Sequence, residues 1–194
     1  MVRRLGDAKA RLFGWDKNLR YKEWVKKFER DIKELRNQTG ANADKRLAYT
    51  IVLYLQLTNG CRIGEAVEAV KKLVSEFPDD RRVRVKVEKR KDGAERLIVI
   101  PKTIRKEDIR RVAWVFQNDT ETIKNRLKSW TKKRYGINTH SLRYAFISEL
   151  ARRGVSAQLI AKITMHSKLD YVLYYTQKVQ AEELLEEFVL SRKI

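Results

Sequence analysis

The segment that decides the fold of this chain runs from residue 138 to residue 176 and reads NTHSLRYAFISELARRGVSAQLIAKITMHSKLDYVLYYT. It contains both histidines of the sequence, His140 and His166, and it places Arg143 three residues after His140. A helix that begins near Ser141 would hold His140 and Arg143 at its first turn. Free backbone N–H groups and the positive end of the helix dipole favour an anion there.

The same segment predicts two short helices that share a core. Gly154 is expected to end the first helix in a left-handed conformation, and Ser156 is expected to cap the second. The second helix then places Leu159, Ile160 and Ile163 on one apolar face. The first helix offers a matching apolar stripe, made of Leu142, Ala145, Phe146 and Leu150.

The charge of the chain predicts a polyanionic partner. Among 194 residues there are 44 Lys and Arg against 25 Asp and Glu, which gives a net charge of +19, while 43% hydrophobic residues suffice for a core. Nucleic acid is the polyanion that such a surface most often binds. The alternative is a heat-adapted surface rich in charged residues, which explains the density of charge but not its sign.

The cysteine and histidine content narrows the class of protein further. A single cysteine, Cys61, excludes an internal disulfide and indicates a reducing compartment. Two histidines and one cysteine cannot form a His/Cys structural zinc site, and we expect no metal or other cofactor. Because the sequence shows no apolar run of membrane-spanning length and no signal-peptide pattern, we expect a soluble, cytoplasmic protein without a membrane partner.

The first half of the chain predicts two helices followed by a charged turn. Residues 20–36 form an amphipathic helix, whose basic side fits either a solvated surface or a contact with DNA. Residues 44–57 are apolar on nearly all sides, which predicts a central, buried helix that ends at Asn59-Gly60. The sequence Cys-Arg-Ile-Gly-Glu at 61–65 then leads into the next helix.

The one clear β pattern lies in residues 83–100. Valine alternates with charged residues over 83–87, and Asp92-Gly93 is typical of a type I′ hairpin turn. Residues 97–100 form the return strand, which stops at Pro101. Helices are predicted at 103–117 and 120–134, and an acidic amphipathic helix at 180–190. The predicted class is therefore α+β, mainly α-helical with one small antiparallel β-hairpin.

The histidine segment resembles the C-terminal half of the tyrosine recombinase (phage integrase) family. The pattern H-x-L-R-[HY]-x-F begins at His140, a glycine and His166 follow, and Tyr175 lies nine residues after His166, which is the spacing of the family. The Tyr-Thr ending of the family favours Tyr175 over Tyr174. One departure is that the family usually has Leu-Gly-His where this chain has Thr-Met-His at 164–166.

A second resemblance lies in T-N-G-C-R-I-G-E at 58–65, where family members typically read T-G-x-R-x-x-E. By that match Arg62 is the first catalytic arginine, and Glu65 is the supporting carboxylate that orients it. The family also carries a catalytic lysine at the tip of a hairpin, for which Lys91 is the candidate and Lys89 the alternative. The resemblance covers roughly residues 42–180 of this chain.

The resemblance implies cleavage and rejoining of duplex DNA through a covalent 3′-phosphotyrosine. Tyr175 would be the nucleophile. Arg62 and Arg143 would bind the non-bridging phosphate oxygens with their planar forks. His140 would assist proton removal or bind phosphate, and His166 would donate a hydrogen bond to a non-bridging oxygen. The hairpin lysine would protonate the leaving 5′ oxygen.

The resemblance also implies a tetramer on DNA and a nucleoid-associated protein encoded by a cell, a virus or a mobile element. Residues 1–40 are interpreted as a basic N-terminal segment with one helix, and residues 41–194 as the catalytic domain. The family usually has a DNA-clamping domain first, so a fragment, a reduced member and a partner-dependent protein all stay open. The helix before the histidine motif runs near DNA in the family, and its candidate contacts are Lys124, Arg126, Lys128, Lys132 and Lys133.

Three functions remain in competition. The first is a site-specific recombinase or integrase. The second is a DNA-binding protein of the same fold that has lost strand exchange. The third is a topoisomerase-like enzyme that nicks and closes DNA with the same chemistry.

Overall fold

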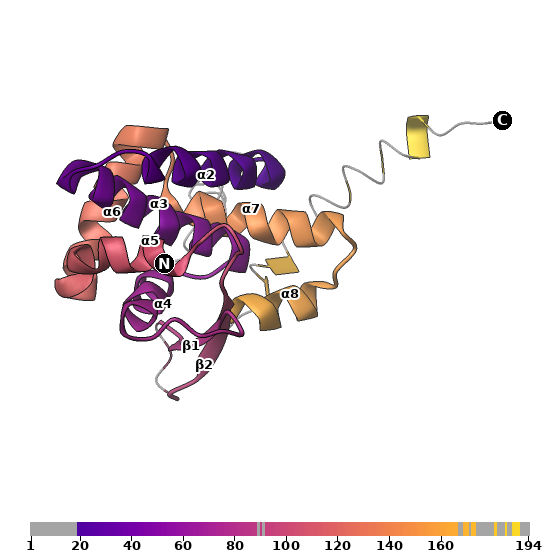
Figure 1. The fold of residues 1–194 in the computed structure, drawn as a ribbon. Coiled ribbons are helices and arrows are strands. Elements are labelled where there is room, and N and C mark those ends of the chain that lie inside the picture. The colour runs from indigo at the N-terminus through magenta and orange to yellow at the C-terminus, as the bar shows by residue number, and fades with distance from the viewer. Residues whose placement is uncertain are drawn as a thin grey trace, which may run out of the picture.

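The computed structural model describes residues 19–88, 90, 92–166, 169–170, 172–173, 181, 185 and 188–190. The described chain is mainly helical with one small antiparallel sheet, which confirms the predicted α+β class (Figure 1). In chain order, the elements are α2 (Tyr21–Arg36), α3 (Ala41–Asn59), α4 (Ile63–Ser75), β1 (Arg82–Lys86), β2 (Glu95–Val99), α5 (Lys106–Val112), η1 (Ala113–Gln117), α6 (Thr120–Tyr135), α7 (Thr139–Arg152) and α8 (Ala157–Thr164).

Helix α3 forms the centre of the core, as its apolar composition predicts. Leu47, Ile51 and Leu55 are fully buried, and α2, α4, α5 and α7 all pack against α3. The helix ends at Gly60, which adopts the left-handed conformation with φ 56°. A Cβ atom at Gly60 would lie only 2.2 Å from the ring of Phe146 on α7. This position therefore needs glycine both for its backbone angle and for the close packing of α7.

Helix α2 belongs to the same hydrophobic core as α3. Phe28 and Ile32 are fully buried, and the Phe28 ring packs edge-on against Tyr135 of α6 at 5.6 Å between centroids. The end of α2 is tied to α5, because Arg36 donates to both carboxylate oxygens of Asp108 at 2.8 and 2.6 Å. The division of the chain after residue 40 stays a prediction, and α2 packs as part of the core that carries the site.

The hairpin differs from its prediction in the connection between the strands. Lys86 pairs with Glu95, so residues 87–94 join β1 to β2 and the predicted two-residue turn at Asp92-Gly93 is wrong. A type I′ turn requires positive φ at both central residues, and Gly93 has it but Asp92 does not. The Asp92 carboxylate instead accepts the Ala94 N–H at 3.2 Å, a local bond that favours a wider loop.

The two helices of the histidine segment form largely as predicted. Helix α7 begins at Thr139, two residues before the predicted start, Gly154 follows it with φ 74°, and the Ser156 hydroxyl accepts the Leu159 N–H. The predicted apolar face of α8 is wrong in part, because Ile160 is buried whereas Leu159 and Ile163 are 50% and 40% exposed. Helix α8 instead packs through Ile160 and Ala161 against Ile147 and Ala151 of α7.

The remaining helices deviate little from the sequence pattern. The helix predicted at 103–117 begins later, at Lys106, because the Asp108 carboxylate accepts the Arg105 N–H at 2.8 Å and so caps the first turn. It continues as the short 3-10 helix η1. Most of the predicted helix at 180–190 lies outside the described residues. None of the described helices combines the length and the apolarity that a membrane span requires.

We predict that Phe28→Ala lowers the free energy of unfolding by about 3–5 kcal/mol, because it leaves a cavity between α2, α3 and α6. Urea denaturation followed by circular dichroism measures this loss. Lys26→Ala, an exposed change on the same helix, is the control and should alter stability by less than about 0.5 kcal/mol. A small effect of Phe28→Ala would show that α2 is not part of the cooperative core.

Candidate active site

Arg62 and Glu65 form a clamp at the start of α4. Arg62 is the residue just before the helix, and Glu65 lies in its first turn with a fully buried side chain. The Glu65 carboxylate accepts the backbone N–H of Arg62 at 2.8 Å and its Nη1 at 3.1 Å. The three-residue spacing therefore fixes the main chain and the guanidinium of Arg62 with one carboxylate.

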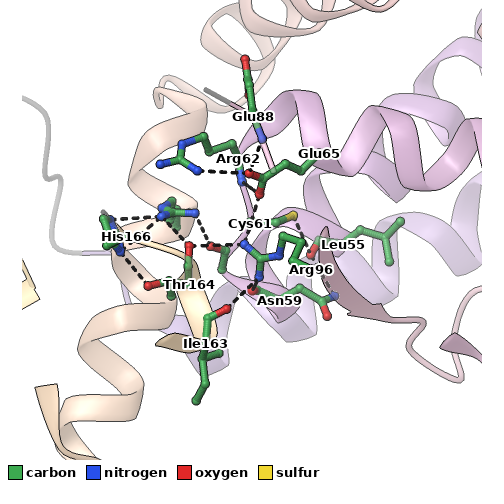
Figure 2. A network of polar contacts seen from close by, with 12 residues as sticks. Leu55, Asn59, Cys61, Arg62, Glu65, Glu88, Arg96, Ile163, Thr164 and His166 are labelled. Carbon is green, nitrogen blue, oxygen red and sulfur yellow. Dashed lines mark hydrogen bonds and ion pairs between the residues drawn. The ribbon is translucent and has the colours of Figure 1, made fainter. Parts of the chain in front are cut away.

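Glu65 also binds the hairpin, and so it joins two parts of the chain. Its Oε1 accepts the backbone N–H of Glu88 at 3.1 Å, and its Oε2 accepts Nη1 of Arg96 at 3.1 Å (Figure 2). A buried carboxylate is costly unless it is paired and hydrogen-bonded, and here four donors converge on it. Glu88 directly precedes Lys89 in the loop between the strands. The clamp on Arg62 thus also anchors the base of that loop.

Arg143 lies beside this clamp and is almost completely buried, at 2% exposed. Its Nη1 donates to the carbonyl of Gly60 at 2.8 Å, and its Nη2 donates to the carbonyl of Thr164 at 2.8 Å. Burial, and then the charge of Arg62, lowers the pKa of Arg143 to about 10, so its guanidinium stays charged at pH 7. The second arginine of the motif is thus held between the end of α3 and the end of α8.

His166 follows a left-handed residue at the end of α8. Met165 has φ 56° and ψ 45°, and the His166 N–H donates to the Ala161 carbonyl at 3.0 Å, which closes the helix. Met165 occupies the place of the family's usual glycine and adopts a backbone conformation that glycine adopts readily. A left-handed backbone costs a non-glycine residue roughly 1–2 kcal/mol. The departure in sequence therefore adds strain to this turn.

The contacts of His166 favour one tautomer of its ring. The Thr164 hydroxyl lies 2.7 Å from the Ile160 carbonyl, which can only accept, so the single hydroxyl proton is used there. The same hydroxyl is 2.6 Å from Nδ1 of His166 and must therefore accept the Nδ1–H. Nη2 of Arg143 lies 3.1 Å from the other nitrogen, Nε2, and 3.3 Å from Nδ1 of the same ring. The contact with Thr164 therefore favours a neutral ring with its proton on Nδ1, where Nε2 carries none.

The surroundings of His166 oppose its protonation. Burial is the largest cause, followed by the charges of Arg143 and Arg62, and together they lower the pKa of His166 to about 3. The predicted role of His166, donation of a hydrogen bond to phosphate, requires a proton on Nε2. An anion near the two arginines would oppose their effect and raise the pKa of the ring.

His140 lies apart from the buried groups, at the exposed start of α7. Its backbone N–H donates to the Asn138 side chain at 3.2 Å, and its ring stacks on Tyr144 with centroids 5.9 Å apart. It lies in the first turn of α7, the place where the sequence predicted an anion, and the Ser141 N–H of that turn donates to the Asn138 carbonyl at 3.0 Å. A positive charge on the His140 ring would also lower the pKa of His166.

The predicted DNA contacts on the basic helix α6 stay predictions, and Lys124 differs from the others in its surroundings. The Lys124 ammonium lies 2.8 Å from both Glu88 and Glu121, and its side chain is only 12% exposed. Its charge is therefore used inside the protein, and the prediction of a DNA contact at Lys124 is not supported. Lys128 and Lys132 instead line a groove of about 360 Å³ beside the start of α7. The two other predicted contacts, Arg126 and Lys133, are also exposed on α6.

The structure brings together part of the predicted site. Arg62, Arg143 and His166 surround one region, with Glu65 behind Arg62. Three predicted residues lie outside the described part of the chain. They are Lys91, the predicted proton donor, Lys89, its alternative, and Tyr175, the predicted nucleophile. Their roles therefore remain predictions.

Sequence reasoning did not assign a role to Arg96 in β2. The residue is 4% exposed and contacts Glu65 as well as the carbonyls that precede His166. The alternation of β2 could have revealed this role, because it places Arg96 on the same inward side as Ile98 and Ile100. A charge at such an inward position is informative, because it requires buried partners.

Comparison with known proteins agrees with this geometry. The phage integrase family model matches residues 29–182, so this chain belongs to the phage integrase family. An uncharacterized protein of Methanocaldococcus jannaschii is 39% identical over 195 residues, which cover 89% of this chain and 87% of that protein.

Two viral proteins are also similar. The "Putative integrase ORF241" of Acidianus two-tailed virus is 37% identical over 72% of this chain and 56% of its own length. The "Putative integrase V10" of Sputnik virophage is 25% identical over 91% of both chains. The chain is thus similar to integrase-named proteins from two different viruses.

We predict that the His166 ring stays neutral from pH 8 to pH 5 and gains a proton only near pH 3. Since the unfolded ring has a pKa of about 6.5, acidification below that value favours the unfolded state, and stability falls as the pH drops. Nuclear magnetic resonance of the two histidine rings measures the titration, and His140→Gln assigns the signals. A His166 midpoint above pH 5 would contradict the burial and charge described above.

Proposed function

We propose that this protein is a site-specific DNA strand transferase that cleaves and rejoins duplex DNA through a 3′-phosphotyrosine on Tyr175. The observation that carries the proposal is the excess of positive charge in the site. The guanidinium groups of Arg62, Arg96 and Arg143 lie around the Glu65 carboxylate, while the nearby Glu88 carboxylate is paired with Lys124. A buried cluster with surplus positive charge is complementary to an anion, and a phosphodiester supplies one negative charge and two non-bridging oxygens.

In the proposed reaction the phenolate oxygen of Tyr175 attacks phosphorus and the P–O5′ bond breaks. The leaving 5′ oxygen takes a proton from Lys91, or from Lys89 in the alternative assignment, and a second 5′ hydroxyl later reverses the step. The Arg62 fork can reach the phosphate, because its side chain is 19% exposed while Glu65 holds it from behind. Prearranged donors of this kind are typically worth roughly 3–4 kcal/mol each in the transition state.

Arg143 and His166 would change partners when phosphate enters. Nη2 of Arg143 donates to His166 in the free protein, and a phosphate oxygen is a stronger acceptor than a neutral imidazole. The negative charge also raises the pKa of His166 and favours a proton on Nε2, which can then donate to the phosphate. The predicted hydrogen bond from His166 would therefore form in the complex.

The exposed basic side of α6 would hold the flanking duplex. Lys128 and Lys132 lie one helical turn apart on the groove that borders Asn138, and Asn138 caps the helix that carries His140 and Arg143. Backbone phosphates in this groove would lie next to the site. Contacts of this kind position DNA without reading its sequence.

We predict that Tyr175→Phe abolishes covalent attachment to DNA and leaves binding near the wild-type level, because it removes the nucleophilic oxygen and no charge. The measurement uses nicked suicide duplexes with a random-sequence pool, followed by denaturing electrophoresis and sequencing of the joined ends. Tyr174→Phe is the matched control and should keep the adduct. Loss of the adduct in Tyr174→Phe instead would move the nucleophile by one residue.

Wild-type protein that binds the pool but forms no adduct would contradict the proposed reaction. That outcome would favour a DNA-binding protein of this fold without cleavage. If the protein forms adducts and relaxes supercoiled DNA but exchanges no strands, the topoisomerase-like alternative would be favoured.

We also propose that the protein assembles into a tetramer on DNA through its C-terminal segment. The described residues of that segment are exposed and apolar, with Leu185 at 62% and Phe188 at 79%, and the charged residues of its part 180–190 are all acidic on a strongly basic chain. An apolar groove of about 450 Å³ lies between β2 and α8, where Leu97 and Ile163 are exposed. The apolar residues of this segment in a second copy would pack into the groove. The acidic residues of the segment would be attracted to the positively charged surface of the chain.

Deletion of residues 180–194 is predicted to keep nicking at a single site but to remove ordered multimers and strand exchange. Native electrophoresis of the DNA complexes and a strand-exchange assay measure the two effects. A thermal melt is the control, because a large loss of stability would mean that the segment belongs to the core of its own protomer.

A further inference from the structure

Arg96 is a charged residue at a position where the strand pattern requires an apolar one. Exposed and buried residues alternate along β2, and Arg96 lies on the buried side together with Ile98. Leu97 and Val99 point outward and are 41% and 49% exposed. Burial of an ionised side chain is unfavourable unless close partners compensate it. The partners of Arg96 should therefore show what this arginine does.

The guanidinium of Arg96 binds three separate parts of the chain. Nη1 donates to Oε2 of Glu65 at 3.1 Å, and Nη2 donates to the carbonyl of Asn59 at 2.7 Å. Nη2 also donates to the carbonyl of Ile163 at 3.2 Å, and Nη1 lies 3.5 Å from the carbonyl of Thr164. Figure 2 shows Arg96 between Asn59, Glu65 and the end of α8.

Each of these parts holds one group of the site. Asn59 and Glu65 lie at either end of the turn that carries Arg62, and Glu65 binds Arg62 directly. Ile163 and Thr164 form the last turn of α8, just before His166. Helix ends leave carbonyl groups without partners, and a cation there is favourable. Arg96 therefore joins the turn of Arg62 to the helix end that presents His166.

We propose that Arg96 is a positioning residue for DNA cleavage, which sets the separation of Arg62 and His166 through Glu65 and the end of α8. This inference rests on the proposed strand-transfer function. Arg96 acts from behind the site, since its side chain is only 3% exposed. It belongs to the strand that follows the loop with Lys89 and Lys91, so it also ties the hairpin to the two groups that meet the phosphate.

An arginine suits this role better than a lysine. The planar guanidinium presents several N–H groups in fixed directions and can bond the Glu65 carboxylate and the Asn59 carbonyl at the same time. A lysine supplies a single point of positive charge on a flexible chain. Arg96→Lys would therefore keep the charge and lose the bridge, which separates positioning from electrostatics.

The test compares Arg96→Met, Arg96→Lys and a matched control, Arg81→Met. Arg81 lies just before β1 and also donates to main-chain carbonyls, those of Ile100, Pro101 and Ile104, but it does not contact Glu65. Its replacement reports the loss of an equivalent structural arginine in the same hairpin. All variants are measured at saturating suicide duplex, so that the cleavage rate of bound DNA is separated from affinity.

We expect Arg96→Met to slow cleavage of bound DNA by roughly 10- to 100-fold, which is the scale of a small misplacement of reacting groups. Arg96→Lys should not restore the rate, whereas Arg81→Met should leave it within about twofold of wild type. Wild-type rates in both Arg96 variants would overturn the proposal. Equal losses in Arg96→Met and Arg81→Met would overturn it too, because they would reflect general destabilisation.

A second readout needs no DNA cleavage. The chain has only two histidines, so the ring signals of His166 can be followed by magnetic resonance in the free protein. Arg96→Met should shift the His166 signals and Arg81→Met should not. Unchanged His166 signals in Arg96→Met would overturn the positioning role. If wild-type protein forms no adduct, the proposed function fails and the cleavage role of Arg96 fails with it, whereas unchanged His166 signals would overturn the positioning role alone.

Discussion

The buried carboxylate of Glu65 is the interaction on which the rest of the site depends. It accepts hydrogen bonds from the main chain and side chain of Arg62, from the main chain of Glu88 and from Arg96. These donors come from the start of α4, the hairpin loop and β2. A single anion therefore sets how three elements meet, and removal of it would leave buried cations without compensation. The hydrophobic core around α3 supplies the rigid support that makes this arrangement possible.

The site stores positive charge without neutralising it completely. Arg143 remains charged although burial lowers its pKa, and His166 is kept neutral by the same surroundings. Much of the cost of holding the arginines close together is met when the chain folds, with Glu65 and the carbonyls of Gly60 and Thr164 as partners. An entering phosphate then meets positive charge that is already assembled, and in the proposed reaction only Arg143 and His166 change partners. Lys124 differs from these arginines, because its ammonium group is neutralised by two carboxylates and its side chain is largely buried.

The sequence predicted the helices and the two motifs well, because each rests on local information. Apolar periodicity identified α3 and α7, the three-residue spacing drew attention to His140 with Arg143, and the family resemblance identified Arg62 with Glu65. The errors came from contacts distant in sequence. The Asp92-Gly93 pair did not reveal that Lys86 pairs with Glu95, and the pattern of α8 did not reveal which side packs on α7. Sequence reasoning gave Arg96 no role and took Lys124 for a DNA contact, because the partners of both residues lie tens of residues away.

The side chain of Asn59 has a consequence for how the protein behaves at high concentration. Its amide donates to the carbonyl of Val99 at 3.0 Å and accepts the Val99 N–H at 2.8 Å, as a neighbouring strand would. A two-stranded sheet otherwise offers open edges that can pair with another molecule and start aggregation. Asn59 occupies one such edge at the exposed Val99. Its amide therefore makes the main-chain groups of Val99 unavailable to a strand of another molecule beside the apolar groove.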